Sequence, residues 1–333
     1  MTALDGTEQS SAVAKPPAAA EAAASGDSAA PDGGLDPRPA VGTEPAPAPA
    51  PPPAPASSPP PVAGRRQAVR AVGVGLTLLG VFVLGFAAYL YGVSGIQEGR
   101  SQATQYKDLS NELGNALAPV GPTTPGAPVA ILDIPSIGVR DMVVVEGTSS
   151  ENLMLGPGHL RDTPLPGQGG TSVIYGRRAT FGAPFSRLAQ LRPGDKITTI
   201  TGQGTSSYTV KALAGSRLLI EDPAPNRLIL LTAGSDTVPT YYMYVDADLT
   251  STAQQSPGDL PDIGPQETAL SGDSNALVLT TLWGMALALV SVGGTVAAMR
   301  WSPWLAYLSV APIALLVLWN LYQNLAALLP NVY

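Results

Sequence analysis

Three long apolar segments constrain this chain more than any other feature of its sequence. Residues 71–93 contain no charged side chain, residues 276–298 form a second such run, and residues 303–328 form a third that Pro312 interrupts. A helix of about 20 predominantly apolar residues is long enough to cross the hydrocarbon core of a bilayer. The sequence therefore predicts a membrane protein with three transmembrane helices.

The first apolar segment lies too far into the chain for a typical secretory signal peptide, and no Ala-x-Ala cleavage site follows it. We therefore expect it to remain as an anchor. Arg65, Arg66 and Arg70 precede this segment, and Arg300 lies between the second and the third. Because basic residues favour the cytoplasmic side, the N-terminal tail and the Arg300 turn are predicted to be cytoplasmic and residues 94–275 extracytoplasmic.

Residues 1–64 are dominated by Ala, Pro, Gly and Ser and contain no aromatic residue. Such a segment buries too little apolar surface to offset the conformational entropy lost on ordering. We expect a disordered cytoplasmic tail with polyproline II character in its Pro-rich half. The formal net charge of the chain is -7, and nothing in the sequence suggests the basic face that nucleic acid requires, so nucleic-acid binding is not expected.

The region between the first two apolar segments is predicted to have three parts. Residues 94–127 begin with polar residues at a helical period and are expected to form a stalk. Residues 250–275 have the composition of an exposed linker. Residues 128–249 contain short β-rich runs at 129–134, 142–145, 171–175, 196–201, 207–213, 227–232 and 241–246. Their spacing predicts a mainly β domain, folded as a closed β-barrel, with short helices near Leu153 and at residues 185–188.

Three motifs within this β-rich domain carry a resemblance to a known family. Residues 173–178 read Val-Ile-Tyr-Gly-Arg-Arg, residues 177–185 read Arg-Arg-Ala-Thr-Phe-Gly-Ala-Pro-Phe, and residues 230–233 read Leu-Leu-Thr-Ala. They resemble segments of the sortases that usually read Val-Ile-Ala-Gly-His-Arg, His-Arg-Thr-Thr-Tyr-Gly-Ala-Pro-Phe and Leu-Thr-Thr-Cys. The pattern is most like the sortases of high-GC Gram-positive bacteria. The resemblance spans essentially all of residues 128–249 and implies a sortase-like barrel in a bacterial cell envelope.

The resemblance also implies where the catalytic groups of a sortase would stand. The expected histidine falls on Arg177, the nucleophilic cysteine on Ala233 and the arginine on Tyr242, and the whole chain contains no cysteine. Alanine has no heteroatom that attacks a carbonyl, and arginine stays protonated at physiological pH. Tyrosine donates a hydrogen bond but carries no fixed positive charge. We therefore expect a catalytically degenerate sortase that uses neither a cofactor nor a metal.

The alternative to a loss of catalytic activity is a substitute nucleophile near residue 233. Thr232 and Ser235 lie beside the vacant position, but Thr232 should point to the opposite face of its strand from Ala233. Ser235 would need a general base, and the residue at the expected position is an arginine. His159 is the only histidine in the sequence and lies before the predicted strand 171–175, which leads to the position of the catalytic histidine. A single histidine in such a place more often has a structural role than a catalytic one. Transpeptidase or hydrolase activity through Thr232 or Ser235 stays open.

The same site could bind a ligand without any chemistry. Arg177 and Arg178 would place two cations at the mouth of the groove, with Tyr242 beside them. Guanidinium groups suit phosphate and carboxylate groups, which anionic lipids and glycopolymers of an envelope supply. A structural role, in which Arg177 pairs with an acid such as Asp236, is equally open.

These features favour a non-catalytic, sortase-like membrane protein that acts as a binding or scaffolding subunit of the cell envelope. Two further helices favour an assembly role, because one helix is enough to anchor a barrel. The expected partners are membrane lipids, an anionic envelope ligand and a membrane protein docked on the second and third helices. Asn320, Gln323 and Asn324 share one face of the third helix, where they serve either interfacial hydrogen bonding or docking. The alternatives are the enzyme described above and an accessory subunit of an envelope transporter or glycosyltransferase.

Overall fold

The computed structural model describes residues 62–215, 225–235, 240–256, 258–300 and 303–333. The expected disordered tail lies outside the described residues, except for residues 62–64, which begin the first helix. Asp236, the acid suggested as a partner of Arg177, lies outside them as well.

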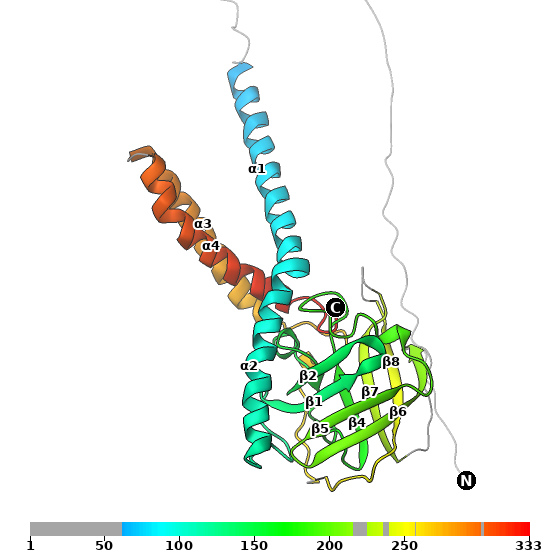
Figure 1. Ribbon diagram of the computed structural model, residues 1–333. Coiled ribbons are helices and arrows are strands. Elements are labelled where there is room, and N and C mark those ends of the chain that lie inside the picture. The colour runs from blue at the N-terminus through cyan, green and yellow to red at the C-terminus, as the bar shows by residue number, and fades with distance from the viewer. Residues whose placement is uncertain (1–61, 216–224, 236–239, 257, 301–302) are drawn as a thin grey trace, which may run out of the picture. The chain divides into compact units, whose positions relative to one another are not determined.

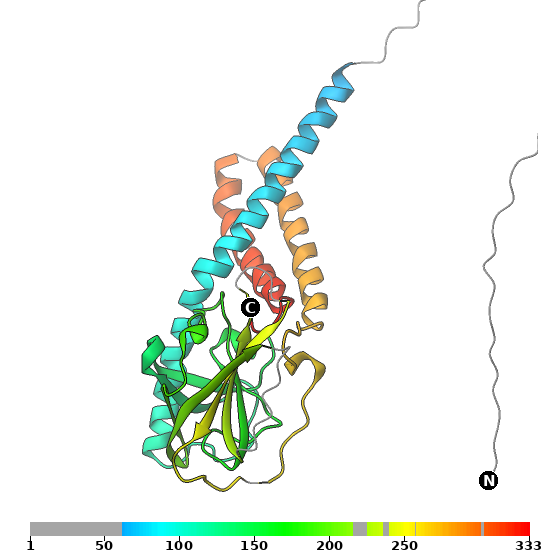
Figure 2. The same cartoon turned by 90° about the vertical axis from the view of Figure 1, so that its right-hand side faces the viewer.

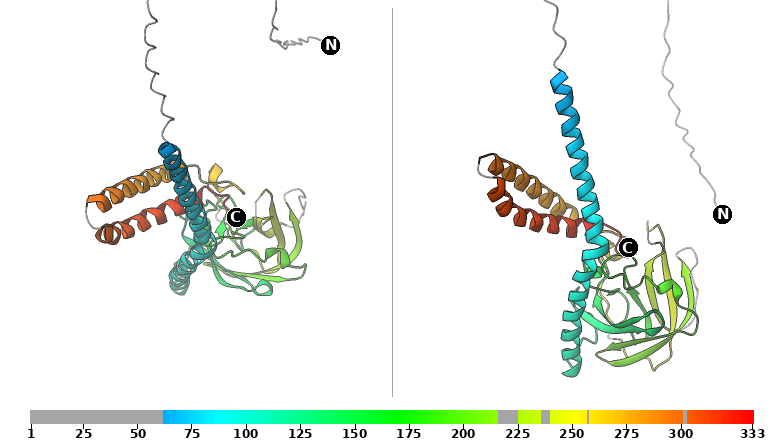
Figure 3. Two further views of the ribbon diagram at one scale, coloured as in Figure 1. Left: turned by 90° about the horizontal axis from the view of Figure 1, so that it is seen from above. Right: turned by 45° about the horizontal axis from the view of Figure 1, so that its top comes forward.

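Long helices account for all three apolar segments. Helix α1 (Val62–Ala88), the π-helical turn η1 (Tyr89–Val93) and helix α2 (Ser94–Gly114) form one continuous rod, whereas α3 (Ala276–Arg300) and α4 (Pro303–Ala327) form a hairpin (Figures 1 and 3). Three stretches are long and apolar enough to cross a membrane: Gln67–Gly114, Ala276–Arg300 and Leu308–Ala327. The three predicted helices are confirmed, and their orientation stays a prediction.

Helix α2 lies against the barrel rather than standing apart from it. At 1.5 Å per residue, the rod from α1 to α2 is about 80 Å long, which is more than twice the thickness of the hydrocarbon core. If α1 crosses a bilayer, α2 is long enough to lie outside it. Leu109 of this half is fully buried in a cluster with Ile131 and Val143. The Gln102 side chain donates to the carbonyl oxygen of Val143 at 3.0 Å and accepts from its N–H at 2.8 Å, which fixes α2 along one strand.

Eight strands close into a barrel whose neighbours follow the order β1-β2-β3-β4-β7-β8-β6-β5. The strands are β1 (Pro128–Ile134), β2 (Val139–Glu146), β3 (Gly158–His159), β4 (Gly170–Tyr175), β5 (Lys196–Thr201), β6 (Gly204–Gly215), β7 (Asn226–Ala233) and β8 (Tyr242–Leu249). The β2–β3 and β4–β7 pairs are parallel and the others are antiparallel. The expected closed barrel and all seven expected strands are confirmed. Strand β3 was not expected, because two residues are too few to show an alternating pattern.

Short 3-10 helices lie at η2 (Pro135–Ile137), η3 (Asn152–Met154), η4 (Leu188–Gln190) and η5 (Pro265–Glu267). The helix expected near Leu153 is η3, whereas the one expected at residues 185–188 forms three residues later, as η4. The segment between the barrel and α3 packs on the barrel in part. Glu267 of this segment is buried, and its carbonyl oxygen accepts from the Thr148 hydroxyl at 2.6 Å.

The side chains of β7 alternate between two cores. Leu228 and Leu230 belong to the main core of the barrel, which also contains Val245 of the neighbouring β8. Leu231 and Ala233 face the other way, into a separate buried cluster. This alternation follows from the two-residue period of a strand. The second cluster covers the end of β7 where the candidate site lies.

Candidate functional site

The barrel topology brings the three positions of interest to one end of the sheet. Arg177 follows β4 by two residues, Ala233 is the last residue of β7, and Tyr242 is the first of β8. Strands β4 and β7 run parallel with Tyr175 opposite Leu231, and Ala233 pairs with Tyr242 across the β7–β8 ladder. The ends of all three strands therefore meet.

Ala233 is sealed inside the protein. Its side chain has no exposed surface and belongs to a cluster with Leu153, Tyr175, Leu231, Tyr244 and Val332. Its carbonyl oxygen accepts from the Arg178 guanidinium at 3.3 Å. A buried methyl group offers neither a nucleophile nor a hydrogen-bonding atom at this position.

Thr232 points away from Ala233, as the strand period predicts. Its side chain is fully buried, and its hydroxyl donates to the carbonyl oxygen of Gly176 at 2.8 Å. The hydroxyl thereby fixes the turn that follows β4 to the end of β7. Because the Thr232 hydroxyl is buried and donates to a backbone carbonyl oxygen, it is not accessible to a substrate in this conformation.

Arg177 is fully buried, which differs from the expectation that it lies at the mouth of a groove. Its guanidinium donates to the carbonyl oxygens of Leu153 at 3.1 Å and Ser150 at 3.0 Å, and to the Thr180 hydroxyl at 3.2 Å. It also lies 4.8 Å from the centre of the Phe181 ring. Within the described residues, no carboxylate forms an ion pair with it.

The surroundings of Arg177 explain how a cation is tolerated there. Burial lowers the pKa of its guanidinium to about 9, which leaves the group protonated near neutral pH. Hydrogen bonds donated to three acceptors, together with the contact with the face of an aromatic ring, offset part of the lost hydration. Arg177 thus joins η3 and its preceding turn to the loop after β4, and it presents no donor at the surface.

The loop after Arg177 carries Phe181 out of the barrel. Phe181, Gly182 and Ala183 have φ values of +49°, +73° and +48°. Left-handed conformations cost Phe and Ala roughly 1 kcal/mol or more each. The loop keeps them because Phe181 is fully buried in a cluster with Tyr89 of η1 and Tyr322 of α4. Its N–H also donates to the Ser94 hydroxyl at 3.0 Å.

Arg178 and Tyr242 are both half-buried and lie near the surface of the site. Besides the carbonyl oxygen of Ala233, the Arg178 guanidinium contacts the Met243 sulfur at 3.4 Å. Of the two adjacent arginines, Arg178 is therefore the one with exposed surface.

Residues 331–333 also lie at this site, although no sequence motif assigns them to it. Asn331 and Val332 have no exposed surface and Tyr333 is 8% exposed. The Arg178 N–H donates to the carbonyl oxygen of Val332 at 3.1 Å, and the Thr180 hydroxyl donates to that of Tyr333 at 2.7 Å. No periodic pattern marks these residues, because they follow the last helix and pack on strands distant in sequence.

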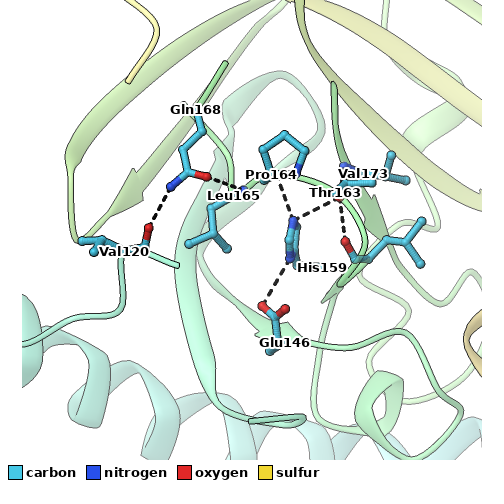
Figure 4. A network of polar contacts seen from close by, with 9 residues as sticks. Val120, Glu146, His159, Thr163, Pro164, Leu165, Gln168 and Val173 are labelled. Atoms are coloured by element: carbon cyan, nitrogen blue, oxygen red, sulfur yellow. Dashed lines mark hydrogen bonds and ion pairs between the residues drawn. The ribbon is translucent and has the colours of Figure 1, made fainter. Parts of the chain in front are cut away.

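His159 lies apart from these residues, in a buried polar network (Figure 4). Its Nδ1 is 3.2 Å from a carboxylate oxygen of Glu146, and its Nε2 is 3.0 Å from the carbonyl oxygen of Pro164. Both ring nitrogens therefore face oxygen acceptors, and both histidine and glutamate are about 1% exposed. This geometry supports the structural role expected for His159: it ties β3 to β2 and to the following turn.

Comparison with known proteins agrees with the fold. Residues 132–245 match a family model described as a sortase domain. The chain contains a sortase domain. Sortase D of Bacillus subtilis (strain 168) is 33% identical over 85 residues, which cover 26% of this chain and 41% of the relative. Sortase SrtE1 of Streptomyces coelicolor is 28% identical over 172 residues, which cover 48% of each protein. The chain thus spans less than half the length of these curated relatives.

Solved structures with similarity to this chain include two sortases. A sortase D5 transpeptidase of Clostridium perfringens is 19% identical, with a TM-score of 0.39, over 46% of this chain and 99% of the other. Sortase E of Streptomyces avermitilis is 30% identical, with a TM-score of 0.34, over 39% of this chain and 91% of the other.

Proposed function

We propose that this protein is a non-catalytic sortase-domain protein of a bacterial envelope membrane that acts as a binding or scaffolding subunit. The observation that carries the proposal is the chemical identity and burial of Ala233, which stands at the position that the family resemblance assigns to the nucleophile. It is a methyl group at the end of β7, and it is buried in one cluster with Val332.

The neighbouring residues support the loss of chemistry. Arg177 stays protonated near neutrality and is buried, so it cannot exchange protons with a substrate. Thr232 is committed to Gly176. His159, the only imidazole in the sequence, is held between Glu146 and Pro164. An unconventional transpeptidase acting through Ser235 would therefore lack a histidine base.

A scaffolding role is supported by the way the sortase domain is joined to the helices. Phe181 packs edge-on against Tyr89, with ring centroids 6.3 Å apart, and Tyr89 lies 5.8 Å from Tyr322 of α4. The Tyr322 hydroxyl donates to the carbonyl oxygen of Phe82 in α1 at 2.9 Å. Helices from both ends of the chain are thus fixed to one loop of the barrel. A membrane partner bound on α3 and α4 would be coupled mechanically to the site.

Two further parts of the proposal concern ligands and partners. Arg178, with Tyr242 beside it, is the residue proposed to meet an anionic envelope ligand, whereas Arg177 acts from inside the protein. Gln323 and Asn324 are proposed to contribute to docking of a membrane protein. Asn324 donates within its own helix, to the carbonyl oxygen of Asn320 at 2.8 Å.

Turnover assays on the full-length protein in mild detergent test the proposal. A fluorogenic peptide that carries a sortase sorting signal should be neither cleaved nor transferred, with a catalytically active sortase as the positive control. Turnover by the wild type that is lost in Ser235→Ala would contradict the proposal and support the enzyme. Co-purification with transporter or glycosyltransferase subunits would support the accessory-subunit alternative.

A further inference from the structure

A cavity of about 520 Å³ lies where the apolar helices meet the sortase domain. Four parts of the chain line it: the start of α2, the residues around η3, the start of α3 and the end of α4. In Figure 2, the start of α3 (orange) and the end of α4 (red) lie side by side next to the sortase domain, and the Asp273 N–H donates to the carbonyl oxygen of Ala327 at 2.9 Å. A volume of this size is typical of sites for small ligands.

The polar side chains that line this cavity, which we name the junction cavity, are Gln97, Glu151, Asp273, Asn275, Gln323 and Asn324. Two of them are carboxylates and four are amides, and none of the described residues in the lining is basic. A cavity whose charges have one sign concentrates ions of the opposite sign. The junction cavity therefore favours a ligand with a positively charged group, and its amides can donate to acceptors beside that group.

Glu151 is the carboxylate that is available to such a ligand. It is exposed and, within the described part of the chain, its side chain forms neither a hydrogen bond nor an ion pair. Asp273 is partly committed, because its Oδ1 accepts from the Asn275 N–H at 2.9 Å at the start of α3. Glu151 can therefore be changed without loss of a contact inside the protein.

Gln323 places an unpaired amide in an apolar helix. The side-chain amides of Asn320 and Asn324 donate to the carbonyl oxygens four residues earlier, both at 2.8 Å. Gln323 is half-buried, and its side chain has no hydrogen-bond partner among the described residues. It lies within Leu308–Ala327, a stretch apolar enough to cross a membrane. Because an unpaired amide is costly in such a segment, a polar group from a ligand or from solvent has to meet it in the cavity.

The junction cavity also lies where the helices change from polar to apolar surroundings. Helix α3 begins at Ala276 and α4 ends at Ala327, and both residues line the cavity. Leu279, one turn into α3, lines it as well and is 50% exposed. If α3 and α4 cross a bilayer, this is the level at which the hydrocarbon core gives way to the headgroups. A ligand with a polar head and apolar chains matches both sides of this boundary.

We propose that the junction cavity binds the headgroup of a membrane lipid that carries a primary ammonium group beside its phosphate, as phosphatidylethanolamine does. The ammonium group donates to Glu151 and Asp273, the phosphate accepts from the amide of Gln323, and the acyl chains continue past Leu279. A primary ammonium group has three N–H donors, whereas the quaternary ammonium of phosphatidylcholine has none. Phosphatidylglycerol carries no cation for the carboxylates. The cavity therefore selects the ethanolamine headgroup.

This lipid site rests on the proposed function only in placing α3 and α4 in a bilayer. It assigns the cavity side of Gln323 and Asn324 to lipid and leaves the outer surface of both helices to a protein partner. A lipid held there would contact the sortase domain through Glu151 and the helices through Asp273 and Gln323 at the same time. Bound lipid would thereby strengthen the attachment of the sortase domain to α3 and α4.

Native mass spectrometry of the full chain, released from mild detergent, tests the site with three lipids of identical acyl chains. Phosphatidylethanolamine should bind about tenfold more tightly than phosphatidylcholine or phosphatidylglycerol, since hydrogen bonds to charged groups are at stake. Glu151→Gln should remove most of this preference. Glu112→Gln is the matched control, because Glu112 lies about 22 Å further along α2 than Gln97 and outside the cavity. Gln323→Leu suits an apolar helix and should weaken binding of phosphatidylethanolamine roughly threefold or more.

Near-UV circular dichroism without added lipid should be the same for the wild type and all three variants. Equal binding of the three lipids, or binding of phosphatidylethanolamine that Glu151→Gln leaves unchanged, would overturn the lipid site and leave the cavity to a basic side chain of a protein partner. Tighter binding of phosphatidylglycerol would show that the charge assignment is wrong. Dissolved phosphoethanolamine, which has no acyl chains, should not compete with the lipid, and equally tight binding would identify a soluble ligand instead. Turnover of a sorting-signal peptide would contradict the proposed function alone, without changing the lipid preference.

Discussion

Replacement of Arg177 by methionine separates a structural role from a ligand-binding role. The substitution removes donors from the Leu153 and Ser150 carbonyl oxygens and from the Thr180 hydroxyl, all three of which lie in the interior. Each lost hydrogen bond costs about 1 kcal/mol net. The contact with the Phe181 ring adds roughly another 1 kcal/mol.

Part of this loss is recovered, because methionine fills much of the same volume and removes a buried charge. We therefore expect a net loss of about 3 kcal/mol in the free energy of unfolding. For a protein of this size, 1 kcal/mol corresponds to about 2–4 °C in Tm, so the expected shift is about 10 °C. Near-UV circular dichroism of the full chain in detergent during heating measures it.

The matched control is Arg187→Met, because the Arg187 side chain is exposed. A surface change of this kind should alter the free energy of unfolding by about 0.5 kcal/mol or less. If Arg177→Met and Arg187→Met both leave the Tm within about 2 °C of the wild type, the structural reasoning for Arg177 is wrong. If Arg177→Met no longer binds an anionic lipid but keeps the Tm of the wild type, a ligand-binding role for Arg177 is favoured.

Three further outcomes are expected. Single cysteines in place of Ser256 and Ser302 should label differently with an impermeant maleimide on intact cells, and equal labelling would contradict the predicted topology. Arg178→Gln should weaken binding to vesicles that contain anionic lipid. The effect should be larger at low salt than at high salt, because salt screens charge interactions over about 8–10 Å. Binding that does not depend on salt would exclude anionic lipids as the ligand. His159→Gln should lower the free energy of unfolding by about 1–3 kcal/mol, because it disturbs the buried hydrogen bonds of the imidazole to Glu146 and Pro164; an unchanged Tm would contradict the structural role of the network.

The barrel, and the places of Arg177, Ala233 and Tyr242 at the ends of its strands, were predictable because they follow from local patterns. Alternation in β7 placed Thr232 and Ala233 on opposite faces, and the β7–β8 pairing brings Tyr242 opposite Ala233. Motif spacing placed Arg177 two residues beyond β4. Each of these inferences uses residues close together in sequence or a family pattern of fixed length.

The environment of Arg177 and the position of residues 331–333 were not predictable in this way. Arginine is mostly exposed in proteins, and only the three acceptors around Arg177 make its burial tolerable. Val332 reaches its cluster through tertiary packing between segments that share no repeat. The helix boundary near residue 328 was clear from hydropathy, but hydropathy gives no sign that the next residues turn back onto the barrel.

The aromatic contacts between Phe181, Tyr89 and Tyr322 have a consequence for how strongly any partner must bind. They hold the end of the barrel that carries the candidate site beside the apolar helices, so a partner anchored in the bilayer that these helices are proposed to cross would meet the site within a thin layer rather than in free solution. Confinement of this kind acts as a short tether does and gives effective concentrations of about millimolar. A contact too weak to detect with a dissolved peptide would then be sufficient in the membrane. Affinities for this protein are therefore best measured with both partners in one bilayer.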